Sequence, residues 1–99
     1  PDLNWCGGLS EAVKIYYIAE AAGLVTIPHG GGNSVFGQHF AFAFPESPMA
    51  EYWLGSAPGI PLEEVPAIPG MAVPQDGRVV PSDAPGFGME IEDEWIVRR

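Results

Sequence analysis

Four consecutive residues, Leu24 to Ile27, constrain the fold of this chain more than any other feature. They are apolar or β-branched without polar alternation, and Gly23 and Pro28 bound them. Such a run is typical of a strand buried on both faces, because a strand with one solvated face alternates polar and apolar residues. Strands of this kind occur mainly in parallel sheets that helices cover. The run therefore favours an α/β fold.

Helices and a further strand are predicted around this run. Apolar residues recur at helical spacing over residues 10–22, with Ser10 suited to cap the start and Gly23 to follow the end. A second helix is predicted over residues 34–44, which prolines end, and another strand over residues 49–54. Strands that alternate with helices over short connections indicate parallel βαβ units.

The second half of the chain is rich in proline and is predicted to be less regular. Residues 55–70 lack any periodicity and are interpreted as an irregular loop. A hairpin turn is predicted at Gln75-Asp76, and the acidic residues 90–95 are interpreted as a solvated terminus. The short strands predicted in this half are residues 71–74, 77–80 and 89–91.

Charge and length exclude several classes of protein and partner. The chain has 99 residues, enough for one small domain, and a formal net charge of -9, with Arg98-Arg99 as its one basic cluster. Nucleic acid and anionic membrane surfaces would repel it. Cys6 is the single cysteine, so an intramolecular disulfide is excluded, and no apolar segment approaches the roughly 18 residues of a membrane span. We expect a cytoplasmic protein with no nucleic-acid or membrane partner.

Three ionisable side chains stand at corresponding places in the predicted pattern. Asp2 precedes the first turn, His29 follows the buried run, and Glu51 lies in the next strand. The C-terminal ends of successive strands lie side by side in a parallel α/β barrel, where active sites are built. The three residues would supply an orienting carboxylate, a proton-transferring imidazole and a second acid. Taken one at a time, each also fits an ordinary role as a turn, capping or ion-pairing residue.

Three glycines follow His29 and leave the backbone there free of side chains. Asn33 or Ser34 can cap the helix behind them. The glycines also suggest a phosphate cradle, but they lack the lysine of a P-loop and the spacing of the dinucleotide fingerprint. His39, within the second predicted helix, is assigned to packing or hydrogen bonding, and Cys6 is interpreted as a small buried residue near the first turn.

Four motifs stand in order along nearly the whole chain. They are PDLNWCGGLSEA at residues 1–12, IPHGG at 27–31, AEY at 50–52 and PGFGMEI at 85–91. Together they resemble the C-terminal part of the enolase superfamily, and its mandelate-racemase subgroup in particular. The resemblance implies an α/β fold, with residues 1–54 as the last parallel βα units of a modified TIM barrel. Residues 55–99 would be a loop and a segment that returns to an α+β capping domain.

The same resemblance implies a chemistry. His29 matches the general base of the family, Asp2 the carboxylate that orients it, and Glu51 the acidic residue at the end of the eighth strand. The full-length enzyme would be a homo-oligomeric sugar-acid dehydratase whose small-molecule substrate chelates Mg²⁺ through its carboxylate. The metal ligands would lie upstream of Pro1, so that the 99-residue chain alone would be inactive.

Two alternatives stay open. The full-length enzyme would fit a racemase, or a dehydratase for another acid sugar, of the same superfamily. A stand-alone, non-catalytic binding module is the alternative from a different class of protein, and it requires that the 99 residues fold by themselves.

Overall fold

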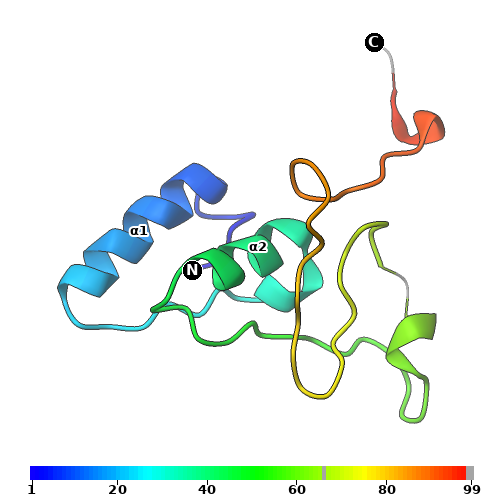
Figure 1. The fold of residues 1–99 in the computed structure, drawn as a ribbon, viewed down its shortest axis with the longest axis horizontal. Coiled ribbons are helices and arrows are strands. Elements are labelled where there is room, and N and C mark those ends of the chain that lie inside the picture. The colour runs from blue at the N-terminus through cyan, green and yellow to red at the C-terminus, as the bar shows by residue number, and fades with distance from the viewer. Residues whose placement is uncertain (66, 98–99) are drawn as a thin grey trace.

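Two α-helices are the longest regular elements in the computed structural model, which describes residues 1–65 and 67–97 (Figure 1). Pro66, in the predicted loop, and the basic pair Arg98-Arg99 lie outside these residues. The elements are, in chain order, α1 (Leu9–Ala21), η1 (Gly31–Asn33), α2 (Val35–Ala43), η2 (Leu62–Glu64) and η3 (Asp93–Trp95), where η marks a short 3-10 helix. Within the described ranges, neither α-helix has the length and apolar character needed to cross a bilayer.

The helix α1 confirms the helix predicted over residues 10–22. Its end is set by Gly23, whose φ of 71° lies in the left-handed region that favours glycine. The Gly23 N–H donates to the Glu20 carbonyl at 2.9 Å, and the Leu24 N–H donates to the Ala19 carbonyl at 2.9 Å. This pair of bonds is the Schellman motif, which satisfies carbonyls that a helix end leaves free.

Two glycines, and not a serine, begin α1. Gly8 is the N-cap with a φ of 86°, and Gly7 before it has a φ of 107°. Side-chain-bearing residues rarely adopt such values, so glycine allows the sharp entry into the helix. The N-cap carries no side-chain hydrogen bond, and Ser10 lies inside the first turn. The prediction of Ser10 as the cap is therefore wrong.

The helix α2 confirms the second predicted helix and decides between its two candidate caps. Ser34 is the N-cap, and its hydroxyl accepts a hydrogen bond from the Gly37 N–H at 3.0 Å. The short helix η1 leads directly into this cap. At the other end Phe44 is extended, and the following Pro45 cannot continue the helix.

The core lies between the two helices and the N-terminal segment. Its buried members are Leu3, Ala12, Tyr16 and Phe40. Cys6, which was predicted to be buried, packs against them but is only partly buried. The ring centroids of Tyr16 and Phe40 are 6.1 Å apart, in an edge-on arrangement. Burying a side chain such as Leu3 or Phe40 stabilises the fold by about 1.5–3 kcal/mol.

Tyr16 ties α1 to the chain beyond α2. Its hydroxyl donates to Glu20 Oε1 at 2.9 Å and accepts from the Glu46 N–H at 3.2 Å. Burial of this ring raises the pKa of Tyr16 above its ordinary value, because the phenolate would lose its solvation. The hydroxyl therefore stays protonated and keeps both hydrogen bonds at neutral pH.

The predicted strands are wrong as elements of a sheet. Among residues 1–65 and 67–97 no strand forms; the affected predictions are residues 24–27, 49–54, 71–74, 77–80 and 89–91. Leu24 and Val25, predicted to be buried on both faces, keep exposed fractions of 60% and 57%. The physical reason is that an interior strand of a parallel sheet needs partners along both edges and cover on both faces, which the described part of the chain does not supply.

The segments predicted as strands 24–27 and 49–54 nevertheless run side by side, and isolated backbone hydrogen bonds connect them and the N-terminus. They run from Thr26 N to Glu46 O (2.8 Å), from His29 N to Pro1 O (2.9 Å) and from Gly32 N to Glu51 O (2.7 Å). The partners rise together along the chain, from Thr26 with Glu46 to Gly32 with Glu51, so these two segments run parallel. The three segments that carry Asp2, His29 and Glu51 therefore lie side by side in chain order.

The described residues of 55–65 and 67–70 are irregular, as predicted, apart from the short helix η2. Gln75 and Arg78 form one antiparallel bridge, so a hairpin turn exists. Its central residues are Asp76 and Gly77, with φ of 48° and 73°, one position later than predicted. Positive φ at both positions is typical of a type I′ turn, which suits Asp followed by Gly. The acidic tail is exposed, as predicted.

Candidate functional site

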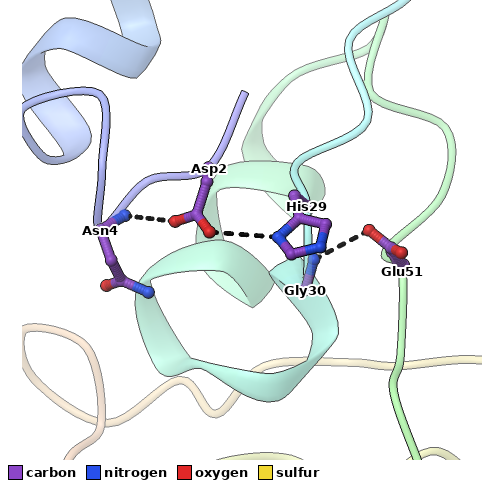
Figure 2. A network of polar contacts seen from close by, with 5 residues as sticks. All are labelled: Asp2, Asn4, His29, Gly30 and Glu51. Carbon is purple, nitrogen blue, oxygen red and sulfur yellow. Dashed lines mark hydrogen bonds and ion pairs between the residues drawn. The ribbon is translucent and has the colours of Figure 1, made fainter.

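Asp2, His29 and Glu51 lie around one open cleft of about 370 Å³. His29 Nδ1 lies 3.1 Å from Asp2 Oδ2, and Glu51 Oε2 accepts a hydrogen bond from the Gly30 N–H at 2.9 Å (Figure 2). The three residues come from segments that are far apart in the sequence. The structure thus brings together all three side chains that were predicted to form the site.

The Asp2 carboxylate is held as a hydrogen-bond acceptor. Its Oδ1 accepts from the Asn4 N–H at 2.8 Å, while Oδ2 faces His29. These bonds, above all the one to His29, lower the pKa of Asp2 below its ordinary value. Asp2 is therefore ionised at neutral pH and can only accept hydrogen bonds.

This carboxylate determines which nitrogen of His29 is free. An ionised Asp2 requires a proton on Nδ1, so the neutral imidazole has its lone pair on Nε2. Among the described residues none hydrogen-bonds to Nε2, and the His29 side chain is 73% exposed. The backbone is fixed, because the His29 N–H donates to the Pro1 carbonyl. His29 can therefore accept a proton from a molecule in the cleft and hold the resulting charge beside Asp2.

The glycines after His29 allow the backbone of the turn to approach its neighbours closely. A Cβ at Gly32 would lie 2.8 Å from the Glu51 carbonyl oxygen, and a Cβ at Gly37 would overlap the carbonyl of Gly31. Gly30 has a φ of 58°, in the left-handed region. Side chains at these positions would push the turn away from the Glu51 segment and from α2.

The turn does not form a phosphate cradle. Such a cradle needs several backbone N–H groups that point freely at the ligand. Here the Gly30 N–H binds the Glu51 carboxylate, the Gly31 N–H donates to Pro28 O at 3.0 Å, and the Gly32 N–H donates to Glu51 O. These bonds assign the glycines to close packing and to the placement of Glu51.

Two residues on the cleft were missed by sequence reasoning. Asn4 and Trp53 line the cleft with the predicted residues. Asn4 lies in the turn that follows Asp2, whereas Trp53 stands two positions after Glu51, and side chains two apart in an extended segment point the same way. That spacing is a signal that could have identified Trp53 from Glu51. Asn33 also lines the cleft, where its side chain binds the backbone of Trp53.

Two polar residues of α2 connect the site to the second half of the chain. Gln38 is buried, and its Nε2 donates to Gly32 O and to Ala72 O, both at 2.7 Å, while its Oε1 accepts from the Ala72 N–H at 2.9 Å. His39 Nε2 lies 3.1 Å from the Phe87 carbonyl, which confirms its predicted structural role. Sequence reasoning missed Gln38, although a glutamine within an apolar helix is a signal of buried hydrogen bonding.

The donor set of the cleft does not fit a metal ion. Among residues 1–65 and 67–97, no group of three or more His, Cys, Asp or Glu side chains could hold one. The two carboxylates of the cleft are also engaged already, Asp2 with His29 and Asn4, and Glu51 with the Gly30 N–H.

Comparison with known proteins extends to nearly the whole chain. The family described as "Enolase C-terminal domain-like" matches residues 1–95. A protein of Caldivirga maquilingensis named "Putative L-rhamnonate dehydratase" is 41% identical over 100 residues, which are 99% of this chain and 25% of that protein. The "L-rhamnonate dehydratase" of Saccharopolyspora erythraea is 35% identical over 102 residues, which are 100% of this chain and 25% of that protein. The chain thus spans about a quarter of the length of these relatives, and no solved structure matches it significantly.

Proposed function

The chain belongs to the enolase C-terminal domain-like family, as its motifs predicted, and we propose that it is the C-terminal part of a sugar-acid dehydratase. The names of the two relatives support L-rhamnonate as the substrate. Loss of water from this acid would give 2-keto-3-deoxy-L-rhamnonate. The single observation that carries the proposal is the hydrogen bond from His29 to Asp2, with Glu51 on the same cleft.

Dehydration of a 2,3-dihydroxy acid needs a base and an acid. The base breaks the C–H bond next to the carboxylate, and the electron pair left on that carbon expels the neighbouring hydroxyl group. The proton and the hydroxide leave as water, and the enol that remains becomes the 2-keto acid. No oxidant or reductant is consumed, so the part of the reaction that we assign to this chain is proton transfer, and the Mg²⁺ ion would stabilise the charge that develops on the substrate carboxylate.

His29 is suited to both proton transfers. Its Nε2 faces no protein partner among the described residues and takes the proton from carbon, while Asp2 stabilises the imidazolium that forms. The imidazolium can then return this proton to the departing hydroxyl group. His29 alone therefore moves the proton in both steps, and the ionised Asp2 keeps the imidazole ring of His29 in the required tautomer.

Glu51 supplies the second acidic group. Its Oε2 is fixed by the Gly30 N–H, next to His29 in the chain, so the distance between base and acid is set by one short turn. When Glu51 carries a proton, its free oxygen can donate a hydrogen bond to a substrate oxygen in the cleft. We assign it the role of hydrogen-bond donor on the side of the cleft opposite Asp2.

The remaining parts of the enzyme belong to the same proposal. We place the ligands of the Mg²⁺ ion outside this chain, because the described residues of the cleft do not offer a fitting donor set. We assign residues 1–54 to the end of a TIM barrel and residues 55–99 to the segment that packs toward a capping domain. The enzyme would be a cytoplasmic homo-oligomer, and the 99-residue chain alone would be inactive.

Product analysis with the full-length protein tests this proposal. The protein is offered a panel of aldonic and aldaric acids, L-rhamnonate among them, with Mg²⁺ present. We expect a 2-keto-3-deoxy acid from L-rhamnonate, and we expect His29→Asn to lower turnover at least about 10²-fold because the base is lost. Racemisation without loss of water would instead support the racemase alternative. Full turnover in the His29→Asn variant would remove His29 from the mechanism.

A further inference from the structure

Asn33 carries an inference that rests on the proposed function. We propose that Asn33 is a positioning residue, whose side-chain amide holds the segment that bears Glu51 against the turn that follows His29. The role assigned to Glu51 requires a fixed distance between these two segments. Asn33 itself acts through Glu51 and does not touch the reacting atoms.

The contact is a two-way hydrogen bond between one side chain and one backbone unit. Asn33 Oδ1 accepts from the Trp53 N–H at 2.6 Å, and Asn33 Nδ2 donates to the Trp53 carbonyl at 2.9 Å. A primary amide offers a donor and an acceptor side by side, as a neighbouring strand would. Asn33 thus pairs with the backbone of Trp53 in place of a strand.

Two further hydrogen bonds act on the same pair of segments. The Gly32 N–H donates to the Glu51 carbonyl, and the Gly30 N–H donates to the Glu51 carboxylate. Residues 30–33 therefore make two hydrogen bonds to Glu51 and two to Trp53, and both of the latter come from the Asn33 side chain. Removing that side chain leaves the backbone after Glu51 without an anchor on the turn.

Burial does not replace this anchor. Trp53 is 72% exposed, and no strand pairs with the segment in the described part of the chain. The side chain of Asn33 is also not needed by the helix that follows, because Ser34 is the N-cap of α2. The geometry of Asn33 is therefore explained by its contact with Trp53 and not by helix capping.

The consequence for the site is a change in the position of Glu51. Without Asn33 the Glu51 segment can move away from the turn, and the Glu51 carboxylate can leave the Gly30 N–H. A displacement of about 1 Å in a catalytic constellation can cost about 10²-fold in rate. We expect Asn33→Ala to lower kcat about 10- to 100-fold, with KM changed less than about 3-fold.

The experiment uses the full-length protein with L-rhamnonate and Mg²⁺. Asn33→Asp keeps the acceptor for the Trp53 N–H but cannot donate to the Trp53 carbonyl, so its kcat should lie between those of the wild type and Asn33→Ala. Gln75→Ala removes a side-chain amide from the exposed hairpin and serves as the matched control, with kcat unchanged. Equal kcat in Asn33→Ala and the wild type would overturn the proposal.

A double-mutant cycle separates positioning from a general loss of structure. If Asn33 acts through Glu51, the Asn33→Ala substitution should lower kcat less than about 3-fold when Glu51→Gln is already present. A full additional loss in that background would overturn the proposal. Misfolding would predict such an additional loss, because it affects the whole site.

A third measurement does not depend on turnover. The exchange of the Gly30 amide hydrogen with solvent should become faster in Asn33→Ala and in Glu51→Ala alike, because both weaken or remove the acceptor at Glu51, and it should be unchanged in Gln75→Ala. If the wild type has no dehydratase activity, the proposed function fails, and the Gly30 exchange alone decides the positioning role. Unchanged exchange in Asn33→Ala would overturn that role whatever the activity.

Discussion

At Gly37, helix propensity favours alanine, but close packing against the preceding turn requires glycine. We expect Gly37→Ala to destabilise the protein, although alanine is the better helix former. In a helix interior the alanine would be favoured by about 1 kcal/mol. Its Cβ, however, would lie 2.8 Å from the carbonyl carbon of Gly31 and would overlap the oxygen. The turn must move by roughly 1 Å to reach an ordinary contact distance.

That movement has a cost that exceeds the propensity gain. Overpacking of a tight contact costs about 1–3 kcal/mol, and displacement of the turn weakens the Gln38–Gly32 hydrogen bond, worth about 1 kcal/mol. The net expectation is a loss of about 2 kcal/mol in the free energy of unfolding. Because His29 lies on the same turn, kcat should also fall, by up to about 10²-fold.

Urea denaturation and steady-state kinetics of the full-length protein measure the two effects. Ala43→Gly, at the exposed end of the same helix, reports the propensity difference without a steric contact and should cost no more than about 1 kcal/mol. A Gly37→Ala protein that is more stable than the wild type, with full activity, would refute the steric reasoning. The Gly31 carbonyl would then not limit the approach of α2.

Two further predictions concern Asp2 and Tyr16. Asp2→Asn should lower kcat about 10- to 100-fold in the full-length protein, because the amide can donate to Nδ1 and leave the proton on Nε2; unchanged kcat would contradict this. The pKa of Asp2 is lowered in the folded chain, so its contribution to stability is present above the ordinary carboxyl pKa and is lost as the pH falls through the lowered value. The difference in denaturation midpoint between wild type and Asp2→Asn should therefore shrink as the pH is lowered from neutral through and below the ordinary carboxyl pKa. Tyr16→Phe removes the hydrogen bonds to Glu20 and Glu46 and should lower the denaturation midpoint without changing the slope m, whereas an unchanged midpoint would show that neither bond stabilises the fold.

The two helices were predictable because their signals are local. Apolar residues recur at helical spacing over residues 10–22, and Gly23 directly follows them. Both signals lie within a few residues of the backbone hydrogen bonds that form and end α1. The cap of α2 was narrowed to Asn33 or Ser34 for the same reason. Sequence reasoning could not choose between them. The side chain of Asn33 is not the cap because it binds the backbone of Trp53, and this partner lies twenty residues farther along the chain.

The site was predictable from an ordering rule, and the strands were not. Asp2, His29 and Glu51 meet because parallel segments in chain order bring their ends together. The apolar run Leu24 to Ile27 predicts cover on both faces, but cover comes from distant parts of a protein, and the described residues leave Leu24 and Val25 exposed. A periodic pattern thus states what a segment requires and not whether its neighbours provide it.

The chain between Trp53 and Ala72 is a loop whose two ends are both bound to the unit formed by η1 and α2. Its first end is bound by Asn33 and its last by Gln38, and these residues stand five positions apart on η1 and α2. Changes in the length of this loop should therefore leave His29 in place, since doubling a loop costs only about 0.6 kcal/mol in closure entropy. Insertions here offer a way to alter the surface beside Asn33 and Trp53 while the Asp2–His29 pair stays intact.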